Sequence, residues 1–166
     1  MAKLQRIRPC LWFDDQAEQA ARFYTGIFKN SRIINVTRYG EAGFEVHHRP
    51  AGSVLTVDFE LDGQRFTALN GGPIFTFNEA VSLEVHCDTQ EEIDYYWEKL
   101  SAGGDPQAQQ CGWLKDRFGL SWQVVPTELT AMLLDEKSPK SQRTFQAMLG
   151  MKKLDIEALE RAYAAG

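Results

Sequence analysis

Hydrophobic and polar positions follow two different periods along this chain, and the two periods occur in the same order twice. The run CLWF at 10–13 leads into DDQAEQAARFYTGIF, and the run SLEVHC at 82–87 leads into DTQEEIDYYWEKL. Each short first run is typical of a strand, and the apolar residues after it recur at the three- and four-residue spacing of a helix. The pattern predicts two strand-to-helix units, repeated after roughly seventy residues.

The first residues of both predicted helices carry a capping signal. Asp15 precedes Glu18 by three positions, and Thr89 precedes Glu92 by three. A side-chain oxygen and a glutamate carboxylate at this spacing can accept hydrogen bonds from the free amides of the first helical turn. We therefore expect the helices to begin at Asp15 and Thr89.

Further strand-like runs complete the first unit: SRIINVTRYG (31–40), SVLTVDFEL (53–61) and QRFTALN (64–70). Asp62-Gly63 joins the last two runs, and this dipeptide favours a type I′ hairpin turn. A two-residue turn predicts the cross-strand pairs Leu61–Gln64, Glu60–Arg65, Phe59–Phe66 and Asp58–Thr67. Successive pairs lie on opposite faces, so an ion pair and an aromatic pair are expected on the two sides of the hairpin.

The second unit repeats this order, and a different pattern follows it. After its helix come a Gly103-Gly104 break, PQAQQCG (106–112), a short strand near 113–115, a turn at 116–119 and the strand LSWQVVP (120–126). Beyond Pro126 the pattern indicates helices only, with Ser138-Pro139 and Asp155 at helix starts. We predict an α+β domain over 1–126 made of two βαβββ modules (1–72 and 80–126), followed by a helical extension over 127–166.

Composition and charge exclude several classes of protein. Of the 166 residues, 43% are hydrophobic and 25% are charged, values typical of a globular domain. No run reaches the ~18 apolar residues of a membrane span, and the first residues lack a signal-peptide pattern, so we expect a cytoplasmic protein without membrane contact. Lys and Arg number 18 against 23 Asp and Glu, a net charge of −5 that disfavours nucleic-acid binding. Cys10, Cys87 and Cys111 lack a metal- or disulfide-type spacing and are expected to be reduced thiols.

Several segments together carry a family resemblance: LWFDDQAEQAARFYTGIF, DFELDGQRFTALNGGP, VSLEVHCDTQEEIDYYWEKLS, CGWLKDRFGLSWQVVP and MKKLDIEALE. The chain resembles the PhnB-like branch of the vicinal oxygen chelate superfamily, which includes glyoxalase I and bleomycin-resistance proteins. The resemblance implies that the two modules form a curved, cup-shaped sheet with the helices outside and a ligand or metal inside, in a homodimer. The apolar positions of the helical extension also favour a homodimer.

The resemblance also implies a divalent metal held by His and Glu, and the sequence departs from that pattern. The positions corresponding to the ligands are Arg8 or Pro9, Val81 or Ser82, Asn70 and Gln123. Carboxylates and imidazoles hold such ions, and none stands at these positions. We therefore predict that the inherited metal site is lost and assign neither metal ligands nor a cofactor, although a divalent metal elsewhere stays open.

Alternation along 82–87 gives the strongest candidate chemistry. Ser82, Glu84 and His86 share one face of the predicted strand, and the apolar residues between them share the other. On the cup interior, Glu84 would orient the imidazole and His86 would act as a general acid or base. The remaining predicted ligand-binding residues are Trp12, Asn70, Trp113, Ser121 and Gln123, and the alternative that Glu84 and His86 are only a structural pair stays open.

Three functions are compatible with this pattern. The first is a small-molecule-binding or metabolic protein without the inherited metal, and the second is a metal-dependent isomerase, lyase or dioxygenase that uses Glu84 and His86. The third is an interaction module whose cup interior is filled by its own side chains. Methyl transfer is not expected, because Gly71-Gly72 and Gly103-Gly104 do not form the glycine-rich turn of a nucleoside-binding βα unit.

Overall fold

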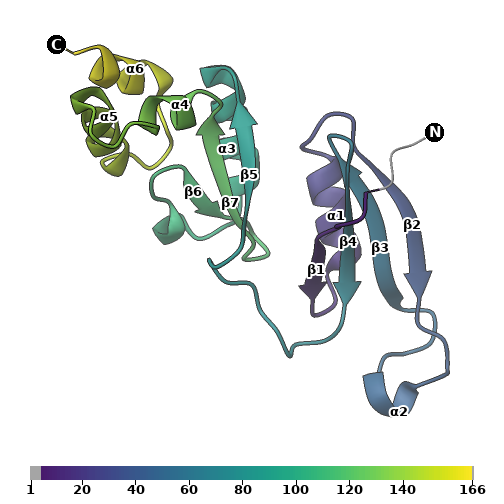
Figure 1. Cartoon of the computed structure of the whole chain (residues 1–166). Coiled ribbons are helices and arrows are strands. Elements are labelled where there is room, and N and C mark those ends of the chain that lie inside the picture. Colours follow the sequence, from purple (N-terminus) through teal and green to yellow (C-terminus); the bar gives the residue numbers. More distant parts are fainter. Residues whose placement is uncertain (1–4, 166) are drawn as a thin grey trace. The chain divides into compact units, whose positions relative to one another are not determined.

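The computed structural model describes residues 5–165. Residues 1–4, at the start of the first predicted module, and Gly166, at the end of the predicted extension, lie outside the described residues. The chain divides into two compact units, Met1–Phe77 and Asn78–Gly166. Each unit has a sheet with a helix packed on one face (Figure 1).

The first unit contains β1 (Cys10–Phe13), α1 (Ala17–Thr25), β2 (Arg32–Arg38), α2 (Phe44–His47), β3 (Val54–Leu61) and β4 (Gln64–Asn70). Its four strands are ordered β1-β4-β3-β2, and β1 runs parallel to β4 while the other pairs are antiparallel. The strands and α1 form the βαβββ order that the sequence predicted, with α2 as a short addition in the β2–β3 connection.

The predicted hairpin between β3 and β4 is confirmed in all four cross-strand pairs. Asp62 and Gly63 have φ values of 45° and 79°, the left-handed conformations that a type I′ turn requires. Arg65 forms an ion pair with Glu60 at 3.4 Å on one face. On the other face the rings of Phe59 and Phe66 stack at 5.4 Å.

The start of α1 differs from the prediction. The helix begins at Ala17, its N-cap residue Gln16 makes no side-chain cap hydrogen bond, and Asp15 is not the cap. Instead the amide of Ala17 donates a 2.8 Å hydrogen bond to Oδ1 of Asn70, at the end of β4. A partner 53 residues away replaces the local cap, so the helix is anchored directly to the sheet.

The second unit contains β5 (Ser82–Cys87), α3 (Gln90–Ser101), the 3₁₀ turn η1 (Pro106–Ala108), β6 (Trp113–Lys115), β7 (Ser121–Pro126), α4 (Leu129–Leu133), α5 (Pro139–Leu149) and α6 (Ile156–Ala164). Its sheet has three strands in the order β5-β7-β6, with β5 parallel to β7. The cap at Thr89 is confirmed, because its side chain accepts a hydrogen bond from the amide of Glu92.

The fourth strand that the repeat implied within 106–112 does not form. Asp105 caps a 3₁₀ turn at Pro106, and the only pairing in this segment is an isolated bridge between Gln110 and Trp113. Proline has no amide hydrogen for a strand ladder, and the segment is diverted into a turn. The second module is therefore βαββ.

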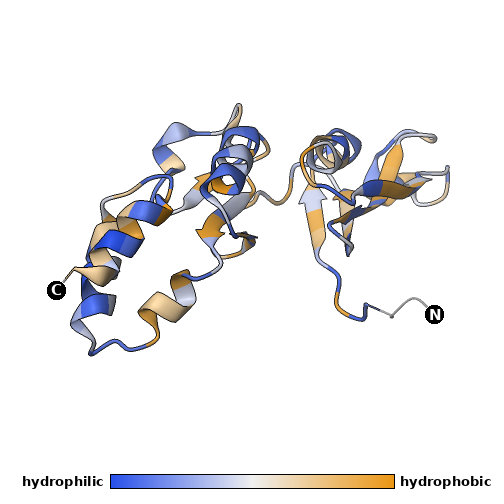
Figure 2. Cartoon of the chain, turned by 90° about the horizontal axis from the view of Figure 1, so that it is seen from above, coloured by the Kyte–Doolittle hydropathy of each residue, from blue (hydrophilic) through white to orange (hydrophobic). Residues whose placement is uncertain are grey.

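The chain after β7 is helical, as predicted. Its helices α4–α6 gather at the end of the second unit's sheet (Figure 1) and bury Val125, Leu129, Leu154 and Leu159 together. Asp155 caps α6 by accepting a hydrogen bond from the amide of Ala158. In Figure 2 the strands carry much of the hydrophobic colour and the helices expose hydrophilic faces. No helix within residues 5–165 has the length and apolar composition needed to cross a membrane.

Candidate functional site

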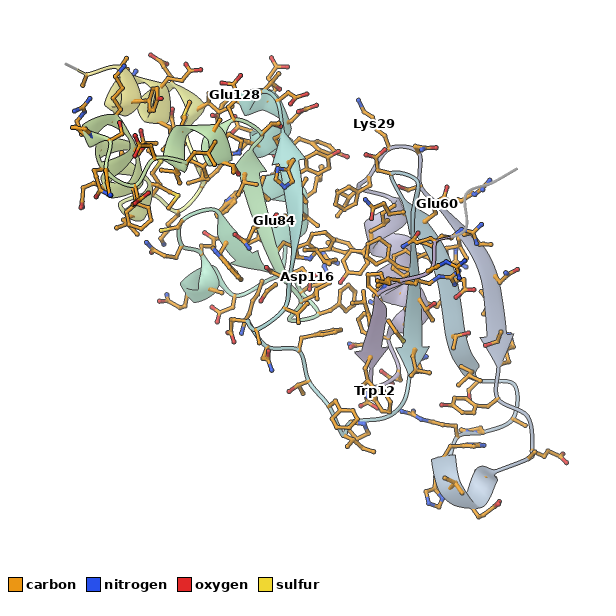
Figure 3. The ribbon with its side chains drawn as sticks, in the orientation of Figure 1. Trp12, Lys29, Glu60, Glu84, Asp116 and Glu128 are labelled. Carbon is orange, nitrogen blue, oxygen red and sulfur yellow. The ribbon has the colours of Figure 1, made fainter. Side chains whose placement is uncertain are left out.

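The face of the second sheet opposite α3 gathers most of the predicted site residues. On β5, Val85 and Cys87 are buried, whereas Glu84 and His86 point to the opposite face and are exposed. The strand register aligns two rows across β5, β7 and β6: Ser82, Ser121 and Lys115 in one, and Glu84, Gln123 and Trp113 in the next. We call these two rows together with His86 the polar face; Glu84 is labelled in Figure 3.

Side chains on the polar face contact one another along and across the strands. Nε2 of His86 lies 3.2 Å from Oε2 of Glu84, and each side chain keeps about half of its surface exposed. Nε2 of Gln123 donates a 2.9 Å hydrogen bond to Oγ of Ser82. The face therefore offers an imidazole, a carboxylate and an amide within one patch.

Ser121 stands out in this patch. It is 1% exposed, and its Oγ is the one buried side-chain oxygen or nitrogen within residues 5–165 that has no hydrogen-bond partner. A buried hydroxyl without a partner costs about 1–3 kcal/mol. In contrast, the buried hydroxyl of Ser141 in the same unit donates to the carbonyl oxygen of Met132 at 2.7 Å.

One end of the polar face carries an ion pair. The ammonium of Lys115, beside Ser121 in the same row, contacts the carboxylate of Glu79. Hydrogen bonding to Lys115 lowers the pKa of Glu79 below its usual value. The ion pair thereby links one end of this row to Glu79, in the segment that precedes β5.

Trp12 has a defined role within the first unit. Its indole packs against Gly71 so closely that a Cβ at this glycine would lie 2.1 Å from the ring. Nε1 of Trp12 donates a 2.9 Å hydrogen bond to the carbonyl of Gly72, and the ring meets Phe75 edge-on at 4.9 Å. Trp12, labelled in Figure 3, thus fixes the segment that follows β4.

Asn70 does not lie with the other predicted ligand-binding residues. It is 5% exposed on the face that α1 covers, where Nδ2 donates to the carbonyl of Val54 at 3.2 Å and Oδ1 accepts from Ala17 at 2.8 Å. Both polar atoms of the amide are engaged in holding α1 and β3. The structure gives Asn70 a cap function, and we leave it out of the candidate site.

The strand registers show why the sequence misplaced this residue. The last residue of β1 pairs with Asn70, but the last residue of β5 pairs with Pro126. Counting back three positions on each strand, Gln123 corresponds to Thr67 rather than to Asn70. Thr67 and its neighbours on the face of the first sheet opposite α1 are therefore the counterparts of the polar face.

Those counterparts form a charged cluster that sequence reasoning did not single out. Oγ1 of Thr67 donates to Asp58 at 2.8 Å, and the guanidinium of Arg8 lies 3.3 Å from the second Asp58 oxygen. Burial and the Asp58 charge raise the pKa of the nearby Cys10 thiol. The predicted Asp58–Thr67 pair was the available signal, because it brought these two side chains to one face.

The residues at the superfamily's metal positions do not fit a divalent metal. Arg8 carries a positive charge and is engaged with Asp58 and Thr67. Ser82 and Gln123 are neutral and hydrogen bonded to each other. Within residues 5–165, no group of three or more His, Cys, Asp or Glu side chains is placed to hold a metal ion. Neither a guanidinium nor a pair of neutral oxygen donors can offset the desolvation of a divalent cation.

The most specific segment of the resemblance is CGWLKDRFGLSWQVVP. Several of its residues stabilise a turn and a buried tryptophan in the fold. Asp116 is 2% exposed and accepts hydrogen bonds from the amides of Phe118 and Leu120 and, at 2.8 Å, from Nε1 of Trp122. Gly119, at φ +83°, adopts the left-handed conformation in this turn. This arrangement buries Trp122 under α3, so that Gln123 points to the polar face.

Comparisons with known proteins agree with this architecture. Residues 5–125 match the family described as 3-demethylubiquinone-9 3-methyltransferase. The PhnB protein from Bacillus cereus, described with the same name, is 37% identical with a TM-score of 0.62, over 74% of this chain and 100% of that chain. No protein of curated function matches the chain significantly.

More distant solved structures share the fold. Protein PA1353 from Pseudomonas aeruginosa is 19% identical with a TM-score of 0.58, over 75% of this chain and 98% of that chain. The fosfomycin resistance protein FosX from Mesorhizobium loti is 15% identical with a TM-score of 0.54, over 81% of this chain and 99% of that chain. These matches confirm the predicted α+β class of the glyoxalase and bleomycin-resistance type.

Proposed function

Because this chain belongs to the 3-demethylubiquinone-9 3-methyltransferase family, the PhnB-like branch of the vicinal oxygen chelate superfamily, we propose that its polar face binds a small organic molecule without a metal. The observation that carries the proposal is the buried, unpartnered hydroxyl of Ser121 in the middle of a row of polar side chains. A polar ligand atom that displaces the side chains covering this hydroxyl would satisfy it, which the protein's own described groups do not.

The neighbouring residues supply the rest of a binding site. Gln123 and His86 offer hydrogen-bond donors and acceptors, and the half-buried indole of Trp113 offers a flat apolar surface for a planar ligand. The Ser82–Gln123 hydrogen bond holds the Gln123 amide in a fixed orientation before the ligand binds. Such preorganisation lowers the entropy cost of binding.

The second candidate is a metal-dependent enzyme that uses Glu84 and His86. Their 3.2 Å contact favours it, since a carboxylate orients an imidazole for proton transfer or for metal binding. Two ligands do not complete a metal site, and this candidate needs a further ligand from the other module or from a second subunit.

Methyl transfer is not part of the proposal, although the family's name contains it. Gly71 follows β4 and packs against Trp12, Gly72 accepts a hydrogen bond from the Trp12 indole, and Gly103 and Gly104 follow α3. Neither pair lies between a strand and the helix after it, where a nucleoside-binding turn belongs.

The proposal includes a homodimer in the cytoplasm. Leu134, just after α4, and Phe145 and Leu149 on α5 expose apolar surface in the segment that follows β7. Cys10, Cys87 and Cys111 are all free thiols, as expected of a reducing compartment. A sedimentation mass equal to one chain would remove the dimer from the proposal.

A thermal-shift screen of small polar metabolites and divalent ions tests the proposed site. We expect an organic compound to raise the melting temperature of the wild type and to lose this effect in Gln123→Ala. Gln146→Ala, an exposed glutamine on α5 of the same unit, is the matched control and should retain it. Equal shifts in both variants would place the ligand elsewhere, and a response to metal ions alone would favour the second candidate.

A further inference from the structure

A cavity of about 300 Å³ lies in the second unit, where α4 and α6 meet the ends of β5 and β7. At roughly 30 Å³ for each water-sized group, it has room for about ten non-hydrogen atoms. This is the lower end of the size range of small-molecule pockets.

The floor of the cavity is apolar. Leu159 and Pro126 are buried there, and Met132 and Ile156 are half-buried beside them. These side chains come from the sheet, from α6 and from the region of α4, so three elements share the floor. An apolar ligand body would remove this surface from water.

The rim of the cavity is acidic. Asp88, Glu128 and Glu160 line it and are exposed, and Figure 3 labels Glu128 at the start of α4. Within residues 5–165 no lysine, arginine or histidine forms an ion pair with any of the three. Thr127 donates a 2.8 Å hydrogen bond to Asp88, which fixes one carboxylate at the rim. Like charges around a concave apolar surface concentrate a negative potential in it.

The chemistry of this rim favours an organic cation over a metal ion. No three acidic, cysteine or histidine side chains within the described residues converge closely enough to hold a metal. The Cys87 thiol at the cavity is also unsuited to metal binding, because burial raises its pKa to about 12 and keeps it protonated. An ammonium group attracted by several separate carboxylates requires no such convergence.

Most residues that line the cavity lie outside the segment matched by the family model. The family match ends at residue 125, and seven of the nine lining residues lie beyond it. The helices after β7 therefore supply most of the lining, and three of its residues, Ile156, Leu159 and Glu160, belong to the segment MKKLDIEALE that carries part of the resemblance.

We propose that this cavity binds a small organic cation, an ammonium compound with an apolar body of about ten non-hydrogen atoms. The apolar body occupies the floor formed by Met132, Ile156 and Leu159, and the charged group lies among the rim carboxylates. This site is separate from the polar face and does not depend on it.

Calorimetric titration with phenethylammonium tests the proposal, with phenethyl alcohol as the neutral ligand of nearly the same shape. We expect the cation to bind more tightly than the alcohol, and we expect its affinity to fall as salt is added. The double variant Glu128→Gln and Glu160→Gln should weaken cation binding about tenfold, since each half-exposed ion pair contributes a few-fold in affinity. It should leave the alcohol's affinity unchanged.

Two controls separate this effect from others. Glu91→Gln with Glu136→Gln removes the same charge from exposed positions that do not line the cavity, and should retain cation binding. Glu84→Gln tests whether the cation binds the polar face instead, and should also retain it. Equal affinity for the two ligands, no saturable binding, or equal losses in the cavity variant and either control would overturn the proposal. Circular dichroism of each variant confirms that the fold is kept.

Discussion

Removing the Ser121 hydroxyl should stabilise the ligand-free protein. In the structure this oxygen is buried, lies between Ser82 and Lys115 in its row, and has no hydrogen-bond partner among the described residues. Ser121→Ala keeps the Cβ and the strand conformation and deletes only the unsatisfied oxygen. The variant therefore isolates the cost of leaving this group without a partner.

The expected magnitude follows from the two opposing effects of the deletion. Burying a hydroxyl without a partner costs about 1–3 kcal/mol, and Ser121→Ala removes this cost. The small void that the missing oxygen leaves destabilises the protein and offsets part of the gain. A net gain of about 1 kcal/mol corresponds to a rise in melting temperature of roughly 2–4 °C for a chain of this size.

Differential scanning calorimetry of the variant and a matched control measures this gain. Ser141→Ala makes the same change in the same unit, at a hydroxyl that is 5% exposed and hydrogen bonded to Met132 at 2.7 Å. It should lower the stability by about 1 kcal/mol. If Ser121→Ala lowers the melting temperature as much as Ser141→Ala does, Ser121 has a partner in solution and the reasoning for a ligand at this position fails.

Four further outcomes follow from buried polar groups and one buried thiol. Asp116→Ala should lower the free energy of unfolding, measured in urea, by about 3 kcal/mol, because it leaves two amides and the Trp122 indole without their acceptor. A decrease of less than about 1 kcal/mol would contradict this. Asn70→Ala should lower the free energy of unfolding by about 2 kcal/mol and speed the hydrogen exchange of the amides in the helix that begins at Ala17. Unchanged protection of these amides would show that the cap is dispensable. Cys87 should resist iodoacetamide at about pH 8 until the protein unfolds, and labelling in the folded state would contradict its burial. Because its folded pKa of about 12 lies above that of the unfolded thiol, its contribution to stability is complete below about pH 9 and is lost as the pH rises toward 12.

Local chemistry was enough to predict much of the fold from the sequence. The Asp62-Gly63 turn fixed the β3–β4 register because a two-residue loop allows one pairing. Thr89 capped its helix because its acceptor and the free amides are neighbours in the chain. The same reasoning failed at Asp15, where the cap came from Asn70 on a distant strand. Such a partner depends on the packing of the sheet against the helix and leaves no local pattern.

The candidate site was predictable only where strand alternation determines it. The alternation of β5 placed Glu84 and His86 together, and that of β7 placed Ser121 and Gln123 together. Asn70 was assigned by its proximity to the end of a strand, and the sequence does not show how far each strand extends past its partner. The strand predicted at 106–112 does not form. The prediction followed the repeat of the first module and gave too little weight to Pro106, which favours a turn.

Elemental analysis of the purified protein by plasma mass spectrometry tests the central claim, a site that needs no metal, most directly. With Arg8 engaged by Asp58 and Ser82 by Gln123, we expect divalent metal far below about one ion per chain, in the wild type and in His86→Ala alike. About one ion per chain in the wild type, lost in His86→Ala, would contradict the account and establish the metal-dependent alternative.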